Sequence, residues 1–293
     1  MKYFVVYFVL ALFSPYVAFC AEDQGNQLLV SVNWLYKQLK QQNVVVVDTR
    51  DQASYRSLHI EGAVNIPVEN TFSPPPREDL VAPLSIIQSL LSNAGISNDT
   101  QVVLYDDKET VNAARVFWVM EVYGQHRVSI LNGGFSKWVD SMYPVTNQLP
   151  PIKRKRFVPE IVPDRLSTKF STRLAITDQS KILLDARNED EYSGKIKKFE
   201  RAGHIPSALN IPTSENLTEM DGHTEIKPVN ELKKLYTGLD KNKKIITYCN
   251  KGKESALTYF VLRELGYAVS AYDGSWFEWN RDMNLPIEIT PRK

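Results

Sequence analysis

The 293-residue sequence has little of several things, and each shortage excludes a class of protein. Only two cysteines and four histidines are present, which excludes a disulfide scaffold and argues against a Cys/His zinc site. Charge of one sign is not in excess, because 35 Lys and Arg against 34 Asp and Glu leave a formal net charge of +1. A dedicated nucleic-acid binder usually carries a clear basic excess, so nucleic acid is not an expected partner. The 43% hydrophobic and 24% charged residues are ordinary for a globular protein, and the length predicts two domains.

Long apolar runs are also scarce, and the one that stands out lies at the N-terminus. Lys2 precedes an apolar stretch over 3–13, and Ala18 and Cys20 place small residues two apart before the chain turns polar. This pattern is typical of a secretory signal peptide. We therefore expect residues 1–20 to be removed and the protein to be secreted or periplasmic, with no stable membrane association once processed. An uncleaved anchor is the alternative, because the run lengthens if the Ser-Pro pair within it is counted.

The chain repeats itself once. The four landmark pairs are 44–50 with 182–187, 59–67 with 204–212, 102–106 with 245–249, and 132–138 with 273–279. Four matches in the same order indicate a domain duplication. The offset between the copies grows from 137 residues at the first landmark to 145 at the second, so the second copy carries an insertion around 195–201.

Each copy alternates short apolar runs with longer amphipathic ones, which is typical of buried parallel strands between helices. The pattern predicts strands at 44–47, 101–105 and 127–131 with a helix at 111–123, and strands at 181–184, 244–248 and 268–272 with a helix at 255–265. We expect an α/β fold in which each copy is a mostly parallel sheet flanked by helices. The predicted domains are 21–145 and 169–293, joined by a proline-rich charged linker at 146–168.

Cys249 follows the predicted strand at 244–248. Ligands of open α/β sheets bind beyond the carboxyl ends of the strands. The next loop leads into a helix, so backbone N–H groups and the helix N-terminus would surround the cysteine, while Lys251 and Lys253 add positive charge. Gly252 allows the loop to adopt backbone conformations that other residues rarely adopt. We expect a lowered pKa for the Cys249 thiol and room for an anion beside it, the alternative being an inert buried cysteine.

These motifs resemble the tandem-domain rhodanese-type sulfurtransferases. The resemblance rests on the duplicated Asp-x-Arg and His-Ile-x-x-Ala-x-Asn-Ile-Pro segments, the Cys-x-x-Gly loop and the Tyr-Asp-Gly-Ser-Trp stretch, and it covers roughly residues 30–289. It implies two rhodanese-like domains. The first is catalytically inert and has Asp106 in place of the cysteine, and the second is catalytic.

The resemblance also implies a reaction. Cys249 takes the sulfane sulfur of a small anionic donor, thiosulfate, and passes it from a persulfide to cyanide or a thiol acceptor, with no cofactor and no metal. The alternatives are a 3-mercaptopyruvate sulfurtransferase and an exported persulfide carrier that is not an enzyme. The sequence specifies no oligomeric state.

The candidate site residues come from the Cys249 loop and two arginines nearby. Around catalytic Cys249, the predicted substrate-binding residues are Arg187, Asn250, Lys251, Gly252, Lys253, Glu254, Ser255 and Arg201. For Arg187, a plain salt bridge with a neighbouring carboxylate is an equal alternative. Glu254 stands where the family usually has threonine or arginine. Carboxylates at helix starts commonly point to solvent, so we expect Glu254 to point outward. Asp273, and Asn132 at the matching place, are expected to cap local turns.

Overall fold

The structure is a computed structural model that describes residues 27–39, 43–77, 80–107 and 109–290. The predicted signal peptide, residues 1–20, lies outside the described residues. Within the described part of the chain, no helix combines the length and the hydrophobicity needed to cross a bilayer.

The first copy is built on a parallel sheet. Its elements are β1 (Leu29–Val30), α1 (Val32–Gln38), β2 (Val44–Asp48), α2 (Gln52–Ser57), β3 (His59–Ile60), β4 (Val64–Asn65), the 3-10 helix η1 (Val68–Thr71), α3 (Leu84–Asn93), β5 (Gln101–Tyr105), α4 (Val111–Val122), β6 (Val128–Leu131), α5 (Gly134–Asp140) and β7 (Val145–Thr146). The five parallel strands follow the order β1-β6-β5-β2-β4, and β3 pairs separately with β7.

The second copy repeats this arrangement. Its elements are η2 (Pro163–Arg165), β8 (Leu166–Ser167), α6 (Lys169–Ala175), β9 (Lys181–Asp185), α7 (Glu189–Tyr192), β10 (Leu209–Asn210), η3 (Thr213–Asn216), β11 (Leu217–Met220), β12 (His223–Ile226), α8 (Val229–Leu235), β13 (Lys244–Tyr248), α9 (Glu254–Glu264), β14 (Val269–Tyr272) and α10 (Ser275–Arg281). Its parallel sheet has the order β10-β9-β13-β14-β8, the same topology read from the other edge. The predicted α/β class with a mostly parallel sheet in each half is confirmed.

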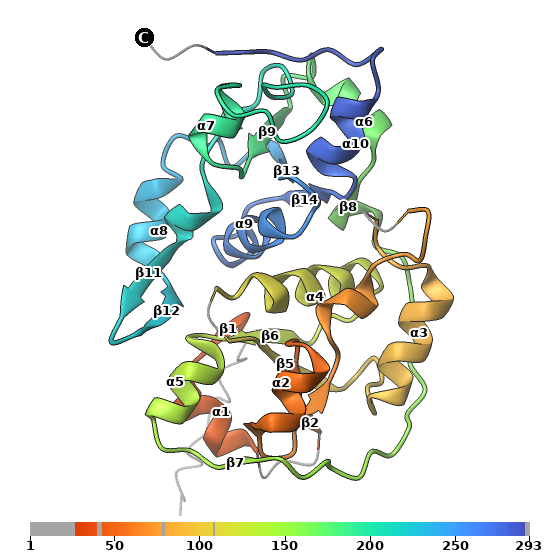
Figure 1. The fold of residues 1–293 in the computed structure, drawn as a ribbon, viewed down its shortest axis with the longest axis vertical. Helices are drawn as coiled ribbons and strands as arrows, with labels where there is room; N and C mark the ends of the chain where they lie inside the picture. Colours follow the sequence, from red (N-terminus) through yellow and green to blue (C-terminus); the bar gives the residue numbers. More distant parts are fainter. Residues whose placement is uncertain (1–26, 40–42, 78–79, 108, 291–293) are drawn as a thin grey trace, which may run out of the picture.

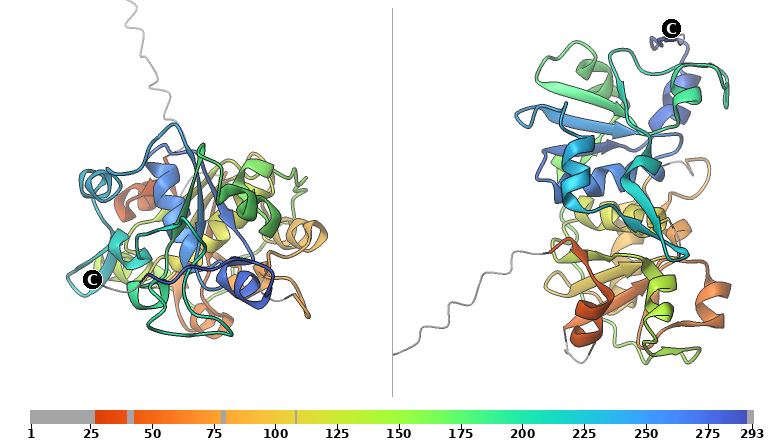
Figure 2. Two further views of the ribbon diagram at one scale, coloured as in Figure 1. Left: turned by 90° about the horizontal axis from the view of Figure 1, so that it is seen from above. Right: turned by 90° about the vertical axis from the view of Figure 1, so that its left-hand side faces the viewer.

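The two copies are stacked along the long axis of the molecule and share one hydrophobic core (Figures 1 and 2). Helices α4 and α9 lie against each other between the two sheets, and most residues of both helices are buried. The rings of Phe117 and Phe260 meet edge to face, with centroids 4.9 Å apart. Because α9 is covered by the first copy, the loop that precedes it opens toward the junction between the copies.

Each copy also sends an arm onto the other. From the arm after η1, the backbone N–H of Val81 donates to the Asp273 carboxylate at 2.6 Å. From the hairpin β11–β12, the Glu225 carboxylate accepts a hydrogen bond from the Asn132 side chain at 3.0 Å. The prediction that Asp273 and Asn132 cap local turns is therefore wrong, because both side chains bind an arm from the other half of the chain.

The segment predicted as a linker, 146–168, packs on the first copy. Phe157 is fully buried in the shared core, and the backbone N–H of Lys155 donates to the carbonyl of Ser92 at 3.1 Å. Strand β8 lies inside this segment and already belongs to the second sheet. The connection therefore helps to hold the two copies in a fixed relation.

Candidate active site at the junction of the two copies

Cys249 lies between strand β13 and helix α9, and it is a free cysteine. The backbone N–H of Gly252 donates to its sulfur, with 3.1 Å between N and Sγ. Gly252 has φ +73°, and a Cβ atom there would come within 2.7 Å of the Asp273 carbonyl oxygen, so the turn requires glycine. Two backbone N–H groups of α10 donate to the carbonyls of Cys249 and Asn250 at 2.9 Å, so α10 holds the backbone of the loop in place.

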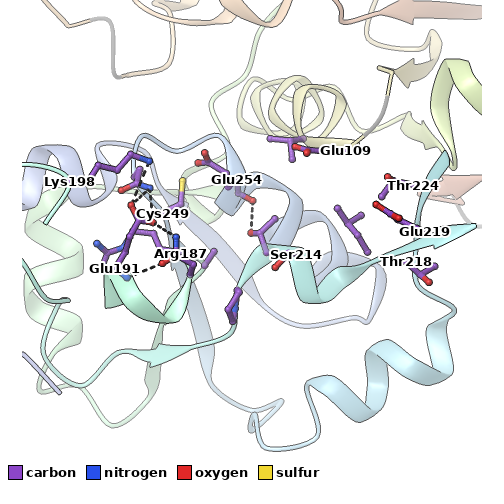
Figure 3. Close-up of a pocket in the computed structure, with 17 residues that line it drawn as sticks. Glu109, Arg187, Glu191, Lys198, Ser214, Thr218, Glu219, Thr224, Cys249 and Glu254 are labelled. Atoms are coloured by element: carbon purple, nitrogen blue, oxygen red, sulfur yellow. Dashed lines mark hydrogen bonds and ion pairs between the residues drawn. The ribbon is translucent and has the colours of Figure 1, made fainter. Parts of the chain in front are cut away.

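A cavity of about 470 Å³ borders Cys249 at the junction of the copies (Figure 3). Its lining residues are Glu109, Val111, Ala186, Arg187, Asn188, Glu191, Lys198, Pro212, Thr213, Ser214, Leu217, Thr218, Glu219, Thr224, Cys249, Asn250 and Glu254. The first copy contributes the start of α4, and the second contributes α7, the β11–β12 hairpin and the Cys249 loop. The volume is that of an ordinary small-molecule site.

The Cys249 thiol is fully buried, and its pKa is raised to about 12. Burial is the largest cause, followed by the negative charge of Glu254, while contacts with Ser255 act in the opposite direction. The expectation of a lowered pKa is therefore wrong. Desolvation and the neighbouring carboxylate outweigh the helix N-terminus and the loop amides.

The two loop lysines point away from this cavity. The Nζ atom of Lys251 lies 4.6 Å from the centroid of the Phe277 ring. Lys251 and Lys253 both border a separate cavity beside Phe72, and among the described residues neither of them lines the Cys249 cavity. Their positive charge therefore stabilises the Cys249 thiolate less than the sequence predicted.

Glu254 faces the cavity, which corrects the predicted outward orientation (Figure 3). Its Oε2 atom is buried and has no hydrogen-bond partner among the described residues. The rule for helix-start carboxylates assumes that the helix begins at open solvent. Helix α9 instead begins against the first copy, so the side chain lies among the cavities at the junction, one of which borders Cys249.

Asn250 forms part of a polar cluster that the sequence did not indicate. Its Nδ2 donates to both carboxylate oxygens of Glu191 at 3.2 Å, and Lys198 lies 3.5 Å from one of them. Asn188, the N-cap of α7, donates to the other oxygen at 3.0 Å. Glu191 lines the cavity from α7 and Lys198 from the inserted region of the second copy, so only the folded chain brings them beside the cysteine.

Arg187 borders the cavity, but its guanidinium is engaged in a buried salt bridge. It forms three hydrogen bonds with the Asp185 carboxylate, between 2.5 and 3.1 Å, and a fourth with a backbone carbonyl. Arg50 repeats these contacts with Asp48 in the first copy. A contact present in both copies favours the salt-bridge alternative for Arg187 over direct substrate binding.

Arg201 lies away from the cavity, and its predicted role in substrate binding is wrong. Its guanidinium donates to four backbone carbonyls at and beyond the end of α10, at 2.7–3.0 Å. Two of these carbonyls, those of Trp279 and Asn280, lie in the last turn of α10, where a helix leaves backbone carbonyls short of partners. Arg201 therefore ties the inserted segment to the end of α10.

In the first copy, a carboxylate occupies the position of the sulfur. The Asp106 side chain accepts backbone N–H bonds from Thr110, Asn112 and Ala113 at 3.0–3.3 Å. Burial raises the pKa of Asp106 to about 6, while these hydrogen bonds act against that rise. The loop of the first copy thus closes around its own anionic side chain.

Arg115 is the residue near the site that sequence reasoning missed. It is fully buried on α4 of the first copy, yet its Nη1 donates to the Gly252 carbonyl at 3.0 Å and to Asp273 at 2.8 Å. The guanidinium also lies against the rings of Phe72 and Trp118. The first copy therefore holds the Cys249 loop in place through one arginine.

Comparison with known proteins agrees with this duplicated fold. The family model of the rhodanese-like domain matches residues 31–141 and 170–282. The chain belongs to the rhodanese family of sulfurtransferases.

Two relatives and one solved structure are similar over nearly the whole chain. A "Putative thiosulfate sulfurtransferase" of Mycolicibacterium smegmatis is 36% identical over 277 residues, covering 90% of this chain and 98% of the relative. The "Sulfur carrier protein TtuD" of Thermus thermophilus is 34% identical, covering 89% and 96%. The structure of SseA from Escherichia coli, a 3-mercaptopyruvate sulfotransferase by its description, has a TM-score of 0.75 at 24% identity and covers 85% of this chain and 99% of its own. At that identity the likeness concerns the fold alone.

Proposed function

We propose that the protein moves a sulfane sulfur through a persulfide on Cys249, with thiosulfate as the donor and cyanide or a thiol as the acceptor. The observation that carries the proposal is a free cysteine that borders a ligand-sized cavity in the second of two rhodanese-like domains. The names of relatives at about 35% identity support thiosulfate as the first donor to test.

The reaction needs no oxidant and no reductant. The sulfur of Cys249 attacks the outer sulfur of thiosulfate, the bond between that sulfur and the sulfite sulfur breaks, and sulfite leaves with the thiol proton as bisulfite. The persulfide then gives its outer sulfur to the acceptor, and Cys249 is regenerated. This is covalent catalysis in two half-reactions. The hydrogen bond from Gly252 is in place to stabilise negative charge on the sulfur during both steps.

A persulfide carrier without rapid turnover is the second candidate. Two features of Cys249 favour it: the raised pKa slows attack by the free thiol, and complete burial shields a persulfide from solvent. The relative named as a sulfur carrier points in the same direction.

Steady-state formation of thiocyanate from thiosulfate and cyanide separates these candidates, with 3-mercaptopyruvate compared as donor. An enzyme turns over many times per Cys249, and a carrier stops after one sulfur per chain. The Cys249→Ser variant should keep the fold and lose all activity. Turnover by the serine variant would overturn the assignment of the nucleophile.

We also propose that the protein is exported through removal of residues 1–20. Sequencing of the mature N-terminus from secreted or periplasmic material tests this. A chain that starts near Ala21 supports export with cleavage, and an intact Met1 in the membrane fraction supports the anchor instead.

A further inference from the structure

Two residues that line the Cys249 cavity each have a buried acceptor atom with no hydrogen-bond donor among the described residues. One is Oδ1 of Asn250, a residue that is only 8% exposed, and the other is Oε2 of Glu254. The orientation of the Asn250 amide is fixed, because its Nδ2 donates to both oxygens of Glu191. A buried acceptor without a donor is costly, so both atoms call for a ligand that brings N–H groups.

The charge of the cavity wall points to the same kind of ligand. Among the residues that the structure describes, four carboxylates line the cavity, against two cationic side chains. Both cations are engaged, Arg187 with Asp185 and Lys198 with Glu191. Three carboxylates remain, Glu109, Glu219 and Glu254, and they come from three different elements around the opening (Figure 3). The described side chains that line the cavity therefore carry a net negative charge.

We propose that the cavity selects a positively charged sulfur acceptor, a small thiol that carries a protonated amine, with Glu254 and the Asn250 amide oxygen accepting its N–H groups. This inference rests on the proposed persulfide chemistry. The acceptor thiol attacks the outer sulfur of the Cys249 persulfide, a new sulfur–sulfur bond forms on the acceptor, and the bond to Cys249 breaks. The acceptor leaves as a persulfide anion, and its thiol proton passes to the Cys249 sulfur.

The direct test measures the field at Cys249 without any turnover. Two methanethiosulfonate reagents, one with a trimethylammonium group and one with a sulfonate, modify Cys249 by the same disulfide-forming reaction, which releases methanesulfinate. Mass spectrometry of the Cys249 peptide gives both rate constants. For Cys249, we expect the ratio of the rate constant with the cationic reagent to that with the anionic reagent to be about tenfold higher than the same ratio for free 2-mercaptoethanol. Glu254→Gln should bring the ratio most of the way back to the value for the free thiol.

Matched variants control for folding. Glu109→Gln and Glu219→Gln change exposed carboxylates of the cavity wall and should each lower the ratio by about twofold, while Glu61→Gln, an exposed carboxylate outside the wall, should leave it unchanged. A ratio equal to that of the free thiol, or one that Glu254→Gln does not alter, would overturn the inference.

Acceptor kinetics test the same inference in the reaction itself. The persulfide is loaded with saturating thiosulfate and then transferred to cysteamine or to 3-mercaptopropionate, which differ in an ammonium or a carboxylate. The preference is the ratio of the transfer rate to cysteamine over the transfer rate to 3-mercaptopropionate, and it should be about tenfold lower in Glu254→Gln than in the wild type. Because both proteins are measured with the same two thiols, the intrinsic reactivity of the thiols cancels. If Cys249 never loads, the proposed function fails while the reagent ratio still decides the inference. If it loads and the preference does not change, only the inference fails.

Discussion

Replacing Glu254 by glutamine should lower the pKa of the Cys249 thiol. Burial is the first cause of the pKa of about 12, and the substitution leaves it in place. The second cause is the carboxylate charge. Coulomb's law gives about 4 kcal/mol for two unit charges about 4 Å apart at an effective dielectric constant of about 20, which corresponds to about 3 pKa units. Because Glu254 is partly exposed to the cavity, we expect a fall of about 1 to 2 units after screening.

The rate of alkylation by iodoacetamide as a function of pH measures this change, since the neutral reagent does not respond to the field of the cavity. The wild-type rate should still be rising at about pH 10, and the rate profile of the variant should lie about 1 to 2 pH units lower. Glu61→Gln is the control for a lost surface charge. A wild-type profile that levels off below about pH 9 would refute the buried, carboxylate-paired thiol, and identical profiles would refute the role of Glu254.

A second substitution at Glu254 tests how this carboxylate affects the proposed donor. Thiosulfate is a dianion, and it must approach Cys249 past the Glu254 carboxylate. Glu254→Thr should therefore raise kcat/KM for thiosulfate by about tenfold. An outward-pointing Glu254 would have predicted little change.

Two further predictions concern the first copy. Arg115→Met should lower the free energy of unfolding by about 3 kcal/mol, because it leaves Asp273 charged and buried. It should also slow thiocyanate formation, because the Gly252 turn loses its hydrogen bond from Arg115. Denaturant titration measures the first effect and the cyanide assay the second, and wild-type values in both would contradict the contact. The raised pKa of Asp106 means that ionisation opposes folding, so this carboxyl contributes most below about pH 4 and loses that contribution as the pH rises through about 6. The free energy of unfolding of wild type relative to Asp106→Asn should fall by about 3 kcal/mol between about pH 4 and pH 7, whereas a difference independent of pH would contradict the shift.

The fold was readable from the sequence because apolar runs and duplicated landmarks carry it. The runs predicted as strands at 101–105 and 244–248 are β5 and β13. The arm β11–β12 gave no such signal, because its strands are short, polar and stabilised by contacts with the other copy.

The site could be predicted from the sequence only in part, because some of its properties depend on contacts between residues far apart along the chain. The position of Cys249 follows from local order along the chain, whereas its pKa depends on what covers the loop in space. Arg115 and Gly252 are far apart in sequence, so no local pattern could pair them. Arg201 was misread because an arginine near a histidine motif can equally bind an anion or the end of a helix, and only the fold decides which is nearer.

In the proposed reaction, the sulfur atom of Cys249 carries the transferred sulfur. Incubation of the full chain with thiosulfate, followed by mass spectrometry of its peptides, tests this directly. We predict one added sulfur on the peptide that contains Cys249, its removal by cyanide, and no added sulfur in Cys249→Ser. An unmodified Cys249 in a protein that still forms thiocyanate would contradict the account.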